Sequence, residues 1–243
     1  MELRDDLEFG HEDRRRIYEY VERHGSATPE EIRRATGVDR RGMRHHAAIL
    51  RRDGYLRAEG GELCVAFQEG ESEHHRDGGL EFVIRPARQS DLTGLVGAIR
   101  RVAEDGTYIE AESVADIVDH EEVLLRHNAV ESRMFFVATV GEEVVGWAHL
   151  HVPELRKLAH TAELTLGVLA EYRGHGIGSH LLARAVEWAA ERGLEKLYQS
   201  VPSTNEEAVA FLESQGWEVE AVRADHYKLD GEYRDEVMLA TRL

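Results

Sequence analysis

One stretch, residues 163–182, most constrains what this chain can fold into. An apolar-rich run leads into three glycines at alternate positions, Gly174, Gly176 and Gly178, and apolar residues then recur at helical spacing from Leu181 onward. This pattern predicts a strand, a glycine turn and an amphipathic helix. Glycines let the backbone approach a ligand closely, and the first N–H groups of a helix lack internal partners. The unit therefore predicts an anion-binding site.

The spacing of these glycines separates several kinds of phosphate loop. A dinucleotide-binding fingerprint requires a glycine where Ser179 stands, and a Walker loop requires a lysine that this stretch lacks. What fits is Arg173-x-x-Gly176-x-Gly178, with Val168 five residues before the arginine. This arrangement resembles the pyrophosphate loop of the GNAT superfamily of N-acetyltransferases, which binds acetyl-coenzyme A.

A second motif in the correct order supports the resemblance. Asn205 follows Val201 by four residues, Ala208 comes three residues later, and the predicted helix ends at Gly216-Trp217. The resemblance covers residues 80–243. It implies an α/β fold of the α+β GNAT kind, with a mixed central sheet whose two parallel strands splay apart.

The resemblance also implies which residues hold acetyl-CoA. The pantetheine arm would lie between the strand that ends near Val168 and the strand 195–201, and a backbone N–H near Val168 would meet the oxyanion. The cofactor-binding residues that it implies are Leu166, Val168, Arg173, Gly174, His175, Gly176, Ile177, Gly178, Ser179 and Asn205.

Proton transfer is the less settled part of the expected chemistry. An attacking amine must be neutral, and the resemblance makes Glu163 the candidate general base, because several family members use a glutamate on the strand that Glu163 shares with Val168, five residues on. The alternative is a carboxylate on the sheet face with no catalytic role. The other candidate bases are histidines, which titrate near neutrality: His149, His151 and His160.

The general acid departs from the family pattern. Leu212 stands where many members place a tyrosine. Tyr227 or Tyr233 is an alternative acid, and a coenzyme A thiol also leaves without one because its pKa resembles that of cysteine, about 8.5. The loss of the tyrosine also favours a domain that senses acetyl-CoA with little or no catalysis.

Three aromatic or imidazole side chains are candidates for the acceptor-binding site. Tyr108 lies in a loop that helps to wall the acceptor pocket in the family; its alternative role is to pack that loop. Trp147 and His149 alternate with His151 and so share one face of a predicted strand, turned either to the acceptor cleft or to solvent and a covering helix.

The first 68 residues predict a separate domain. Helices are expected over residues 11–25 and 39–52 and from a Thr28 cap to Gly37, followed by strands 54–57 and 62–67. This order resembles a winged helix-turn-helix domain. The polar segment 69–79 is predicted to be a linker, so the expected domains are 1–68 and 80–243.

The third predicted helix, residues 39–52, is the candidate DNA-reading element. It carries arginines at 40, 41, 44, 51 and 52, and arginine is a common reader of bases and phosphates. Residues 1–70 nevertheless hold 13 arginines and 15 acidic residues, a net charge of −2, whereas residues 71–243 hold 17 basic and 32 acidic residues, a net of −15. DNA binding and a role in protein interaction or homodimer formation both stay open.

Composition excludes several other classes. The net charge of −17 and the presence of only three lysines resemble proteins from a high-salt cytoplasm and argue against nucleic-acid binding by overall charge. A single cysteine, Cys64, excludes an intrachain disulfide framework. No apolar run of about 18 residues or signal peptide is present, so we expect a cytoplasmic protein without a membrane partner. We expect no metal, because His74-His75 lacks further ligand spacing.

The sequence as a whole predicts an enzyme that moves acetyl from acetyl-CoA to an amine by direct attack in a ternary complex. The alternative is a winged-helix DNA-binding regulator whose second domain senses acetyl-CoA.

Overall fold

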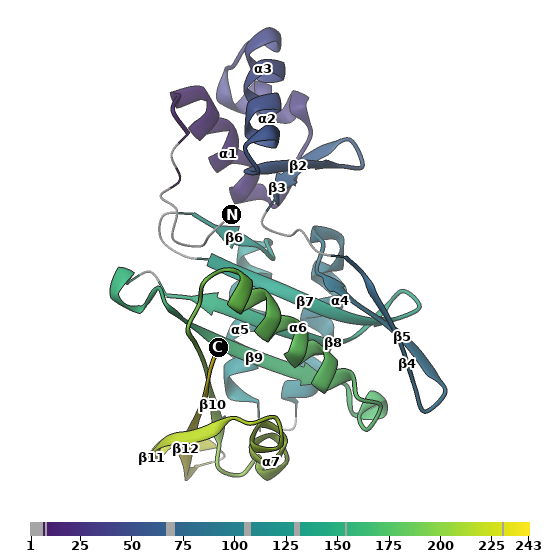
Figure 1. Cartoon of the computed structure of the whole chain (residues 1–243), viewed down its shortest axis with the longest axis vertical. Coiled ribbons are helices and arrows are strands. Elements are labelled where there is room, and N and C mark those ends of the chain that lie inside the picture. Colours follow the sequence, from purple (N-terminus) through teal and green to yellow (C-terminus); the bar gives the residue numbers. More distant parts are fainter. Residues whose placement is uncertain are drawn as a thin grey trace.

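The computed structural model describes residues 7, 9–66, 71–104, 108–128, 132–153, 155–229 and 231–243. Residue 67, the predicted end of a strand, and residues 69 and 70, the first of the predicted linker, lie outside the described residues. Figure 1 shows a small helical part stacked on a larger sheet along the long axis of the molecule. No helix of the described residues is long and apolar enough to cross a bilayer.

The N-terminal part contains three helices and a three-stranded sheet in the order β1-β3-β2. Thr28 forms a capping box with Glu31, and Gly37 ends the same helix in the left-handed conformation, as the sequence predicts. The helices bury Ile17, Val21 and other apolar residues in a common core. The elements are α1 (Glu12–His24), α2 (Pro29–Thr36), α3 (Arg40–Arg52), β1 (Ser26–Ala27), β2 (Leu56–Glu59) and β3 (Glu62–Val65).

The segment predicted to be a linker contains a strand. β4 (Glu73–Asp77) pairs antiparallel with β5 (Leu80–Pro86) along its whole length. The linker prediction is wrong for these five residues, because polar side chains do not prevent pairing at the edge of a sheet. His75 also stacks on Phe82 of β5, with ring centroids 5.3 Å apart.

The larger part is built on a mixed sheet whose main strand order is β11-β12-β10-β9-β8-β7-β5-β4, with β6 paired to β7. β9 and β10 are parallel neighbours and the other pairs are antiparallel. The remaining strands are β6 (Arg126–His127), β7 (Ser132–Val140), β8 (Glu143–Val152), β9 (Thr161–Val168), β10 (Lys196–Pro202), β11 (Glu218–Leu229) and β12 (Glu232–Arg242).

Helices cover both faces of this sheet. In Figure 1, α6 (Ile177–Glu191) lies in front of the sheet, and α4 (Leu92–Ala103) and α5 (Ile109–Glu121) lie behind it. α7 (Glu206–Ser214) packs against the β11–β12 hairpin. Short 3₁₀ turns occur at Gln89–Asp91, Arg156–Leu158 and Ala170–Tyr172.

The chain leaves the helical conformation directly after α5. α5 stops at Glu121, and Glu122 adopts a left-handed conformation with φ of 56°. The residues that follow take other partners: the backbone N–H of Leu124 donates to Gln89, and Arg126 begins β6.

The two parts of the chain are joined by hydrogen bonds as well as by the covalent connection. The buried hydroxyl of Tyr18 on α1 donates to the carbonyl oxygen of His127 at 2.7 Å. The amide of Asn128 donates to the Glu22 carboxylate at 2.9 Å, and Arg126 also contacts Glu22. α1 is therefore anchored to the end of the large sheet that carries β6.

Candidate active site

The central feature of the site is the separation of β9 from β10. These parallel strands pair at three positions and their register ends at Glu163 opposite Tyr198. Beyond that point β9 continues to Val168 while paired with β8 on its other side. The backbone of residues 164–168 that faces β10 therefore has no strand partner there, as expected for splayed strands that receive an extended ligand.

The glycine loop follows the open end of β9. Gly174 and Gly176 have φ values of 80° and 71°, a region that residues with a Cβ rarely adopt. Gly176 is the N-cap of α6, so no side chain caps this helix. The first N–H groups of α6 are thus left for an anionic ligand, and the helix dipole favours negative charge at the same place.

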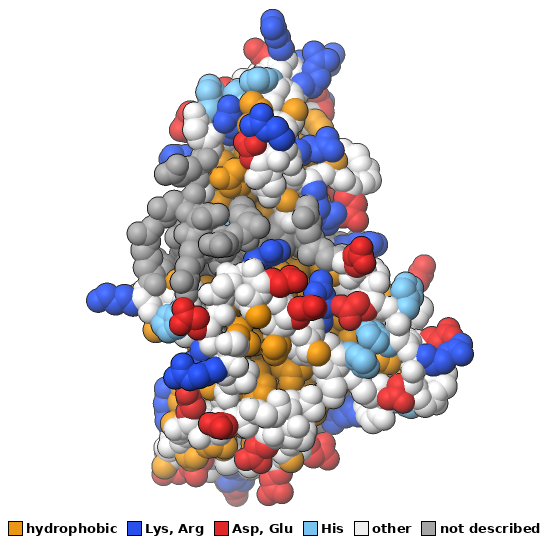
Figure 2. All heavy atoms as spheres, in the orientation of Figure 1, with side chains coloured by type: hydrophobic (Ala, Val, Ile, Leu, Met, Phe, Trp, Pro, Cys, Tyr) orange, Lys and Arg blue, Asp and Glu red, His pale blue; other side chains and the backbone are white. Residues whose placement is uncertain are grey.

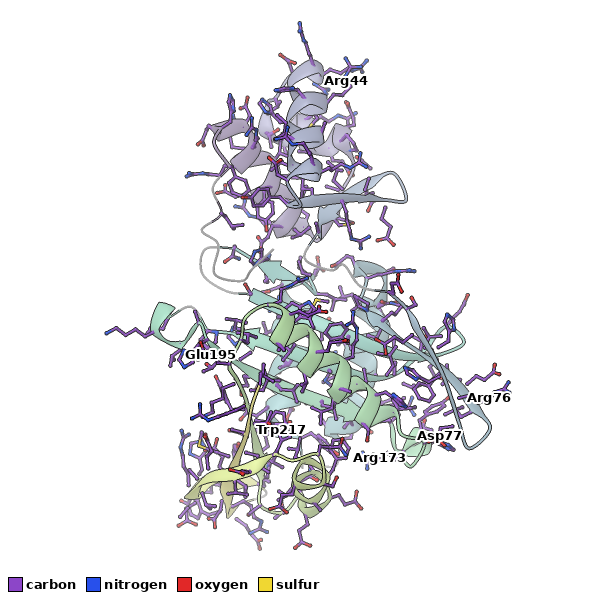
Figure 3. The ribbon with its side chains drawn as sticks, in the orientation of Figure 1. Arg44, Arg76, Asp77, Arg173, Glu195 and Trp217 are labelled. Atoms are coloured by element: carbon purple, nitrogen blue, oxygen red, sulfur yellow. The ribbon has the colours of Figure 1, made fainter. Side chains whose placement is uncertain are left out.

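Arg173 is held beside this loop by its own strand. Its Nε donates to the carbonyl oxygen of Val168 at 3.0 Å, and its guanidinium lies 5.9 Å from the ring centroid of Tyr108. Its only ion pair to a described residue is long, 4.0 Å to the exposed Glu207. Figure 3 shows Arg173 near the start of α6. Apart from the long contact with Glu207, the terminal N–H groups of Arg173 are paired with no described residue, so they can donate to a phosphate.

A cavity of about 320 Å³ joins the splayed strands to the glycine loop. Its walls come from the end of β9, the loop, the first turn of α6 and the facing side of α7. The predicted site residues that line it are Tyr108, Leu166, Val168, Arg173, Gly174, Gly176, Ile177, Gly178 and Ser179. The structure thus brings together eight of the ten residues predicted to bind the cofactor.

The other two predicted cofactor residues lie elsewhere. Asn205 is 7% exposed, caps α7 by accepting from the Ala208 N–H at 3.1 Å, and lines a narrower cavity between β9 and β10. His175 does not line the larger cavity; its ring faces the β4–β5 turn at Gly78. Tyr108 and Leu166 line both cavities, so the two are neighbours.

Carboxylates gather around Glu163, which stands at the last pair between β9 and β10. Glu163 is half-buried on β9, and burial, followed by the nearby Glu110, raises its pKa, while His151 opposes the shift. Glu236 on β12 also raises it. Desolvation and a like charge both disfavour the ionised form, so Glu163 binds a proton more readily than an exposed glutamate.

Tyr227 connects the closing hairpin to this group of carboxylates. Its hydroxyl donates to Glu110 at 3.2 Å, and burial together with Glu110 and Glu236 raises its pKa far above the usual range. Tyr233 is instead 59% exposed. Of the two tyrosines considered as replacements for the family's acid, Tyr227 alone lies with the carboxylates. Leu212 is buried and lines the larger cavity.

Two of the predicted acceptor residues are buried. Trp147 is fully buried against Gly167, where any Cβ would collide with the indole, and His149 is stacked on Phe135 with centroids 4.5 Å apart. Burial lowers the pKa of His149 well below its ordinary value, so the ring is neutral. Neither Trp147 nor His149 is among the described residues that line the two cavities.

Some residues at or beside the larger cavity were not among the predicted site residues. Gln199 on β10 and Phe211 on α7 line the larger cavity, and the Asp77 carboxylate lies against Gly176 from the β4–β5 turn (Figure 3). Asp77 belongs to the segment predicted as a linker, so only a recognised β4 would have placed it. Gln199 follows from the splay itself, because it is the first residue of β10 beyond the last pair.

Comparison with known proteins agrees with this geometry. The family model described as acetyltransferase (GNAT) family matches residues 96–217, about half of the chain. The chain belongs to the GNAT family of acetyltransferases. It is an enzyme of the acyltransferase class, and the family uses acetyl-CoA as the acetyl donor.

Solved structures of GNAT proteins share the fold. A GCN5-related N-acetyltransferase from Kribbella flavida is 22% identical with a TM-score of 0.57, over 67% of this chain and 98% of that one. The ribosomal-protein-alanine N-acetyltransferase from Brucella melitensis is 24% identical with a TM-score of 0.53, over 66% and 99%. The yncA protein from Salmonella typhimurium, solved with its cofactor acetyl-CoA, is 18% identical with a TM-score of 0.55, over 67% and 94%.

Proposed function

We propose that this GNAT enzyme transfers acetyl from acetyl-CoA to a cationic amine by direct attack in a ternary complex. The observation that carries the proposal is the opposite charge of two neighbouring cavities. The glycine loop and Arg173 line the larger cavity, and Glu110 lines the narrower one. Glu163 lines neither cavity, but it lies close enough to Glu110 for that carboxylate to raise its pKa. An anionic donor and a cationic acceptor fit these two cavities by charge.

The cofactor would lie along the open edge of β9. Its pyrophosphate would take the N–H groups at the start of α6 and the guanidinium of Arg173, and its pantetheine would pair with the free backbone near Leu166 and Val168. The thioester would then reach the narrower cavity, where Asn205 and Tyr108 form part of the wall. The oxyanion would be met by a backbone N–H near Val168.

Glu163 is our candidate general base for the amine. A carboxylate whose pKa is raised by burial accepts a proton more readily near neutral pH than an ordinary glutamate. Its cross-strand neighbour His151 and the nearby Glu110 provide routes by which the proton leaves the site. Tyr108 is our candidate proton donor to the coenzyme A thiolate, since this tyrosine lines both cavities.

Glu110 offers a direct test of the acceptor class. We expect Glu110→Gln to raise the KM for the amine about 10-fold, because it removes a charge that attracts the ammonium form and is worth roughly 1.5–3 kcal/mol when hydrogen-bonded. Initial rates of coenzyme A release, first screened over diamines, amino-acid amides and peptides, measure the effect. Glu112→Gln, two residues along α5 and exposed, is the control. Equal KM values in both variants would refute a cationic acceptor beside Glu110.

A second function, DNA binding, is favoured by unpaired cations on α3. We infer that the N-terminal part is a winged helix-turn-helix domain, residues 1–68, and that α3 is its recognition helix. Arg40, Arg44 and Arg51 share one exposed face of α3 and form no ion pair with any described residue. Figure 2 shows Lys and Arg side chains around the N-terminal end of the molecule and Asp and Glu at the opposite end. Arg44 projects outward from α3 (Figure 3).

DNA binding is tested by its salt dependence. We expect labelled genomic duplexes to bind in a fluorescence-anisotropy titration, and replacing Arg40, Arg44 and Arg51 with glutamine to reduce the slope of log K against log salt by about 2–3, because each phosphate contact contributes about 0.9. Arg33 and Arg34 already pair with Glu30, so their glutamine variant is the control. Wild-type protein that retains no duplex at low salt would leave α3 to a protein partner or to a second copy of this chain.

A further inference from the structure

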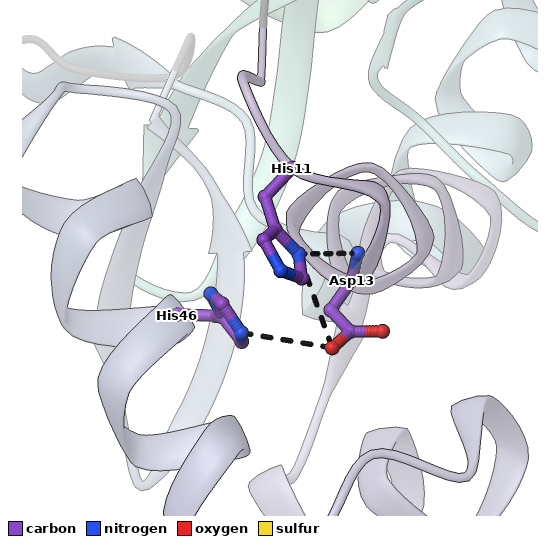
Figure 4. A group of neighbouring side chains, drawn as sticks. All are labelled: His11, Asp13 and His46. Atoms are coloured by element: carbon purple, nitrogen blue, oxygen red, sulfur yellow. Dashed lines mark hydrogen bonds and ion pairs between the residues drawn. The ribbon is translucent and has the colours of Figure 1, made fainter.

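A cluster of metal-ligating side chains lies outside the acetyl-transfer site, in the N-terminal part. His11 is the N-cap of α1, Asp13 stands in the first turn of the same helix, and His46 comes from the middle of α3. One ligand atom from each side chain lies within 4.8 Å of the others. Figure 4 shows both imidazoles turned toward the Asp13 carboxylate.

The three side chains are oriented by their surroundings. Oδ1 of Asp13 is 3.5 Å from the Arg16 guanidinium, which leaves Oδ2 to face the imidazoles: it is 3.6 Å from Nε2 of His46 and 3.9 Å from Nδ1 of His11. The His11 ring is fixed because its Nδ1 accepts the Asp13 N–H at 3.0 Å. Its ring centroid is 4.5 Å from that of His46.

His46 is the unusual member of the cluster. It is 8% exposed, and its Nδ1 is buried without a hydrogen-bond partner among the described residues. Its Nε2 stands beyond hydrogen-bond distance from Asp13, so the contact is not a formed bond. Burial and the neighbouring His11 lower the pKa of His46 and disfavour its charged form. The imidazole of His46 is therefore buried and directed at the Asp13 carboxylate without a hydrogen bond to it. A cation bound between these two groups would give both of them a partner.

We propose that His11, Asp13 and His46 bind a divalent transition metal of the Zn²⁺ class. Two imidazole nitrogens and a carboxylate oxygen are a ligand set that Zn²⁺ accepts, with one position left for water or an external ligand. Bonds of about 2.0–2.2 Å in a tetrahedron place ligand atoms about 3.3–3.5 Å apart. The two imidazole nitrogens lie 3.6 and 3.9 Å from Oδ2, within a few tenths of an ångström of that spacing, and the three ligand atoms all lie within 4.8 Å of one another.

Metal binding has a definite consequence for this part of the chain. His11 exchanges its hydrogen bond from Asp13 for a coordinate bond, and α3 becomes tied to the start of α1 through His46. The bridge joins residues 35 positions apart in a part of the molecule that otherwise relies on its small apolar core. Because the metal binds the folded state, the melting temperature of the N-terminal part rises with metal concentration.

Zinc titration of the full-length protein, free of any histidine tag, tests the proposal. Calorimetry and competition with a chromogenic chelator measure stoichiometry and affinity, and Co²⁺ substitution reports coordination through its visible bands. We expect one tight site per chain. His46→Gln and Asp13→Asn should each weaken it by at least about 100-fold, because even the loss of an outer-shell partner costs about 10–100-fold.

Two histidine variants serve as matched controls. His45→Gln alters the exposed neighbour of His46, and His75→Gln alters the pair that His75 forms with His180 beside α6, with ring centroids 3.9 Å apart. Both should retain wild-type zinc affinity. Asp13 is partly exposed, so its variant keeps the test valid should His46→Gln unfold. Wild-type protein without a tight site, or Asp13→Asn and His46→Gln that bind zinc as wild type does, would overturn the proposal.

Discussion

Replacing Glu163 with glutamine should lower kcat about 100- to 1,000-fold at neutral pH while leaving acetyl-CoA affinity within about twofold. General-base catalysis is commonly worth 10²–10⁴-fold, and glutamine keeps the size of glutamate but accepts no proton. The proposed cofactor contacts, from Leu166 to Ser179, line the larger cavity, which Glu163 does not line. Steady-state rates of coenzyme A release and calorimetric binding of acetyl-CoA separate the two effects.

The pH profile provides a second readout with a definite sign. Glu163 acts as a base only when ionised, so kcat/KM rises as pH increases through its pKa. Burial and Glu110 raise that pKa, which places the acid limb above the ordinary value of 4.5. In Glu163→Gln this limb should disappear, and the remaining rate should follow deprotonation of the amine itself. Glu218→Gln, exposed on β11, is the control. If the acid limb is unchanged in Glu163→Gln, Glu163 is not the general base, and a histidine such as His151 becomes the candidate for that role.

The sequence predicted the glycine loop and the helix after it well, because short-range rules determine their backbone. The positive φ values of Gly174 and Gly176, the start of α6 and the Asn205 cap all follow from residue types at fixed spacing. The mixed sheet with one splayed parallel pair also agrees with the expectation drawn from the family resemblance.

The proposed acceptor site was less predictable because elements far apart in the sequence build it. Glu110 comes from α5, Tyr227 from β11 and Glu236 from β12, and only the folded sheet brings them near Glu163. Alternation placed Trp147 and His149 on one sheet face but could not choose between an acceptor cleft and a covered position, and the structure buries both side chains. His46 illustrates the same limit: it is buried on α3 together with Met43 and Leu50, and its polar partners come from α1, a separate element.

A single substitution in the first turn of α6 can test where the pyrophosphate binds. Gly178 stands in the first turn of α6, and a Cβ built there lies 3.5 Å from Phe211 and 3.9 Å from Leu166, both of which line the larger cavity. These are ordinary contact distances, so an added side chain fits the backbone and points into the space expected to hold the pyrophosphate.

Gly178→Asp should therefore weaken acetyl-CoA binding at least about 100-fold. A carboxylate about 4 Å from a phosphate is repelled by roughly 4 kcal/mol at the effective dielectric typical near a protein surface. The fold should persist, because an acidic residue in the first turn of a helix is favoured by the dipole by about 0.3–1 kcal/mol. Isothermal titration calorimetry measures the affinity, and the thermal unfolding midpoint measures the stability.

Two further variants separate the effect of a charge at position 178 from the effect of added side-chain volume there and from that of an added charge elsewhere on the protein. Gly178→Ala adds only the Cβ that the cavity accepts, so its acetyl-CoA affinity should stay within a few-fold of wild type. Gly97→Asp adds the same charge on the exposed face of α4, where a Cβ meets no atom within 4 Å, and should bind normally. If Gly178→Asp binds acetyl-CoA as tightly as Gly97→Asp does, the pyrophosphate does not lie at the start of α6, and the proposed position of the cofactor is wrong.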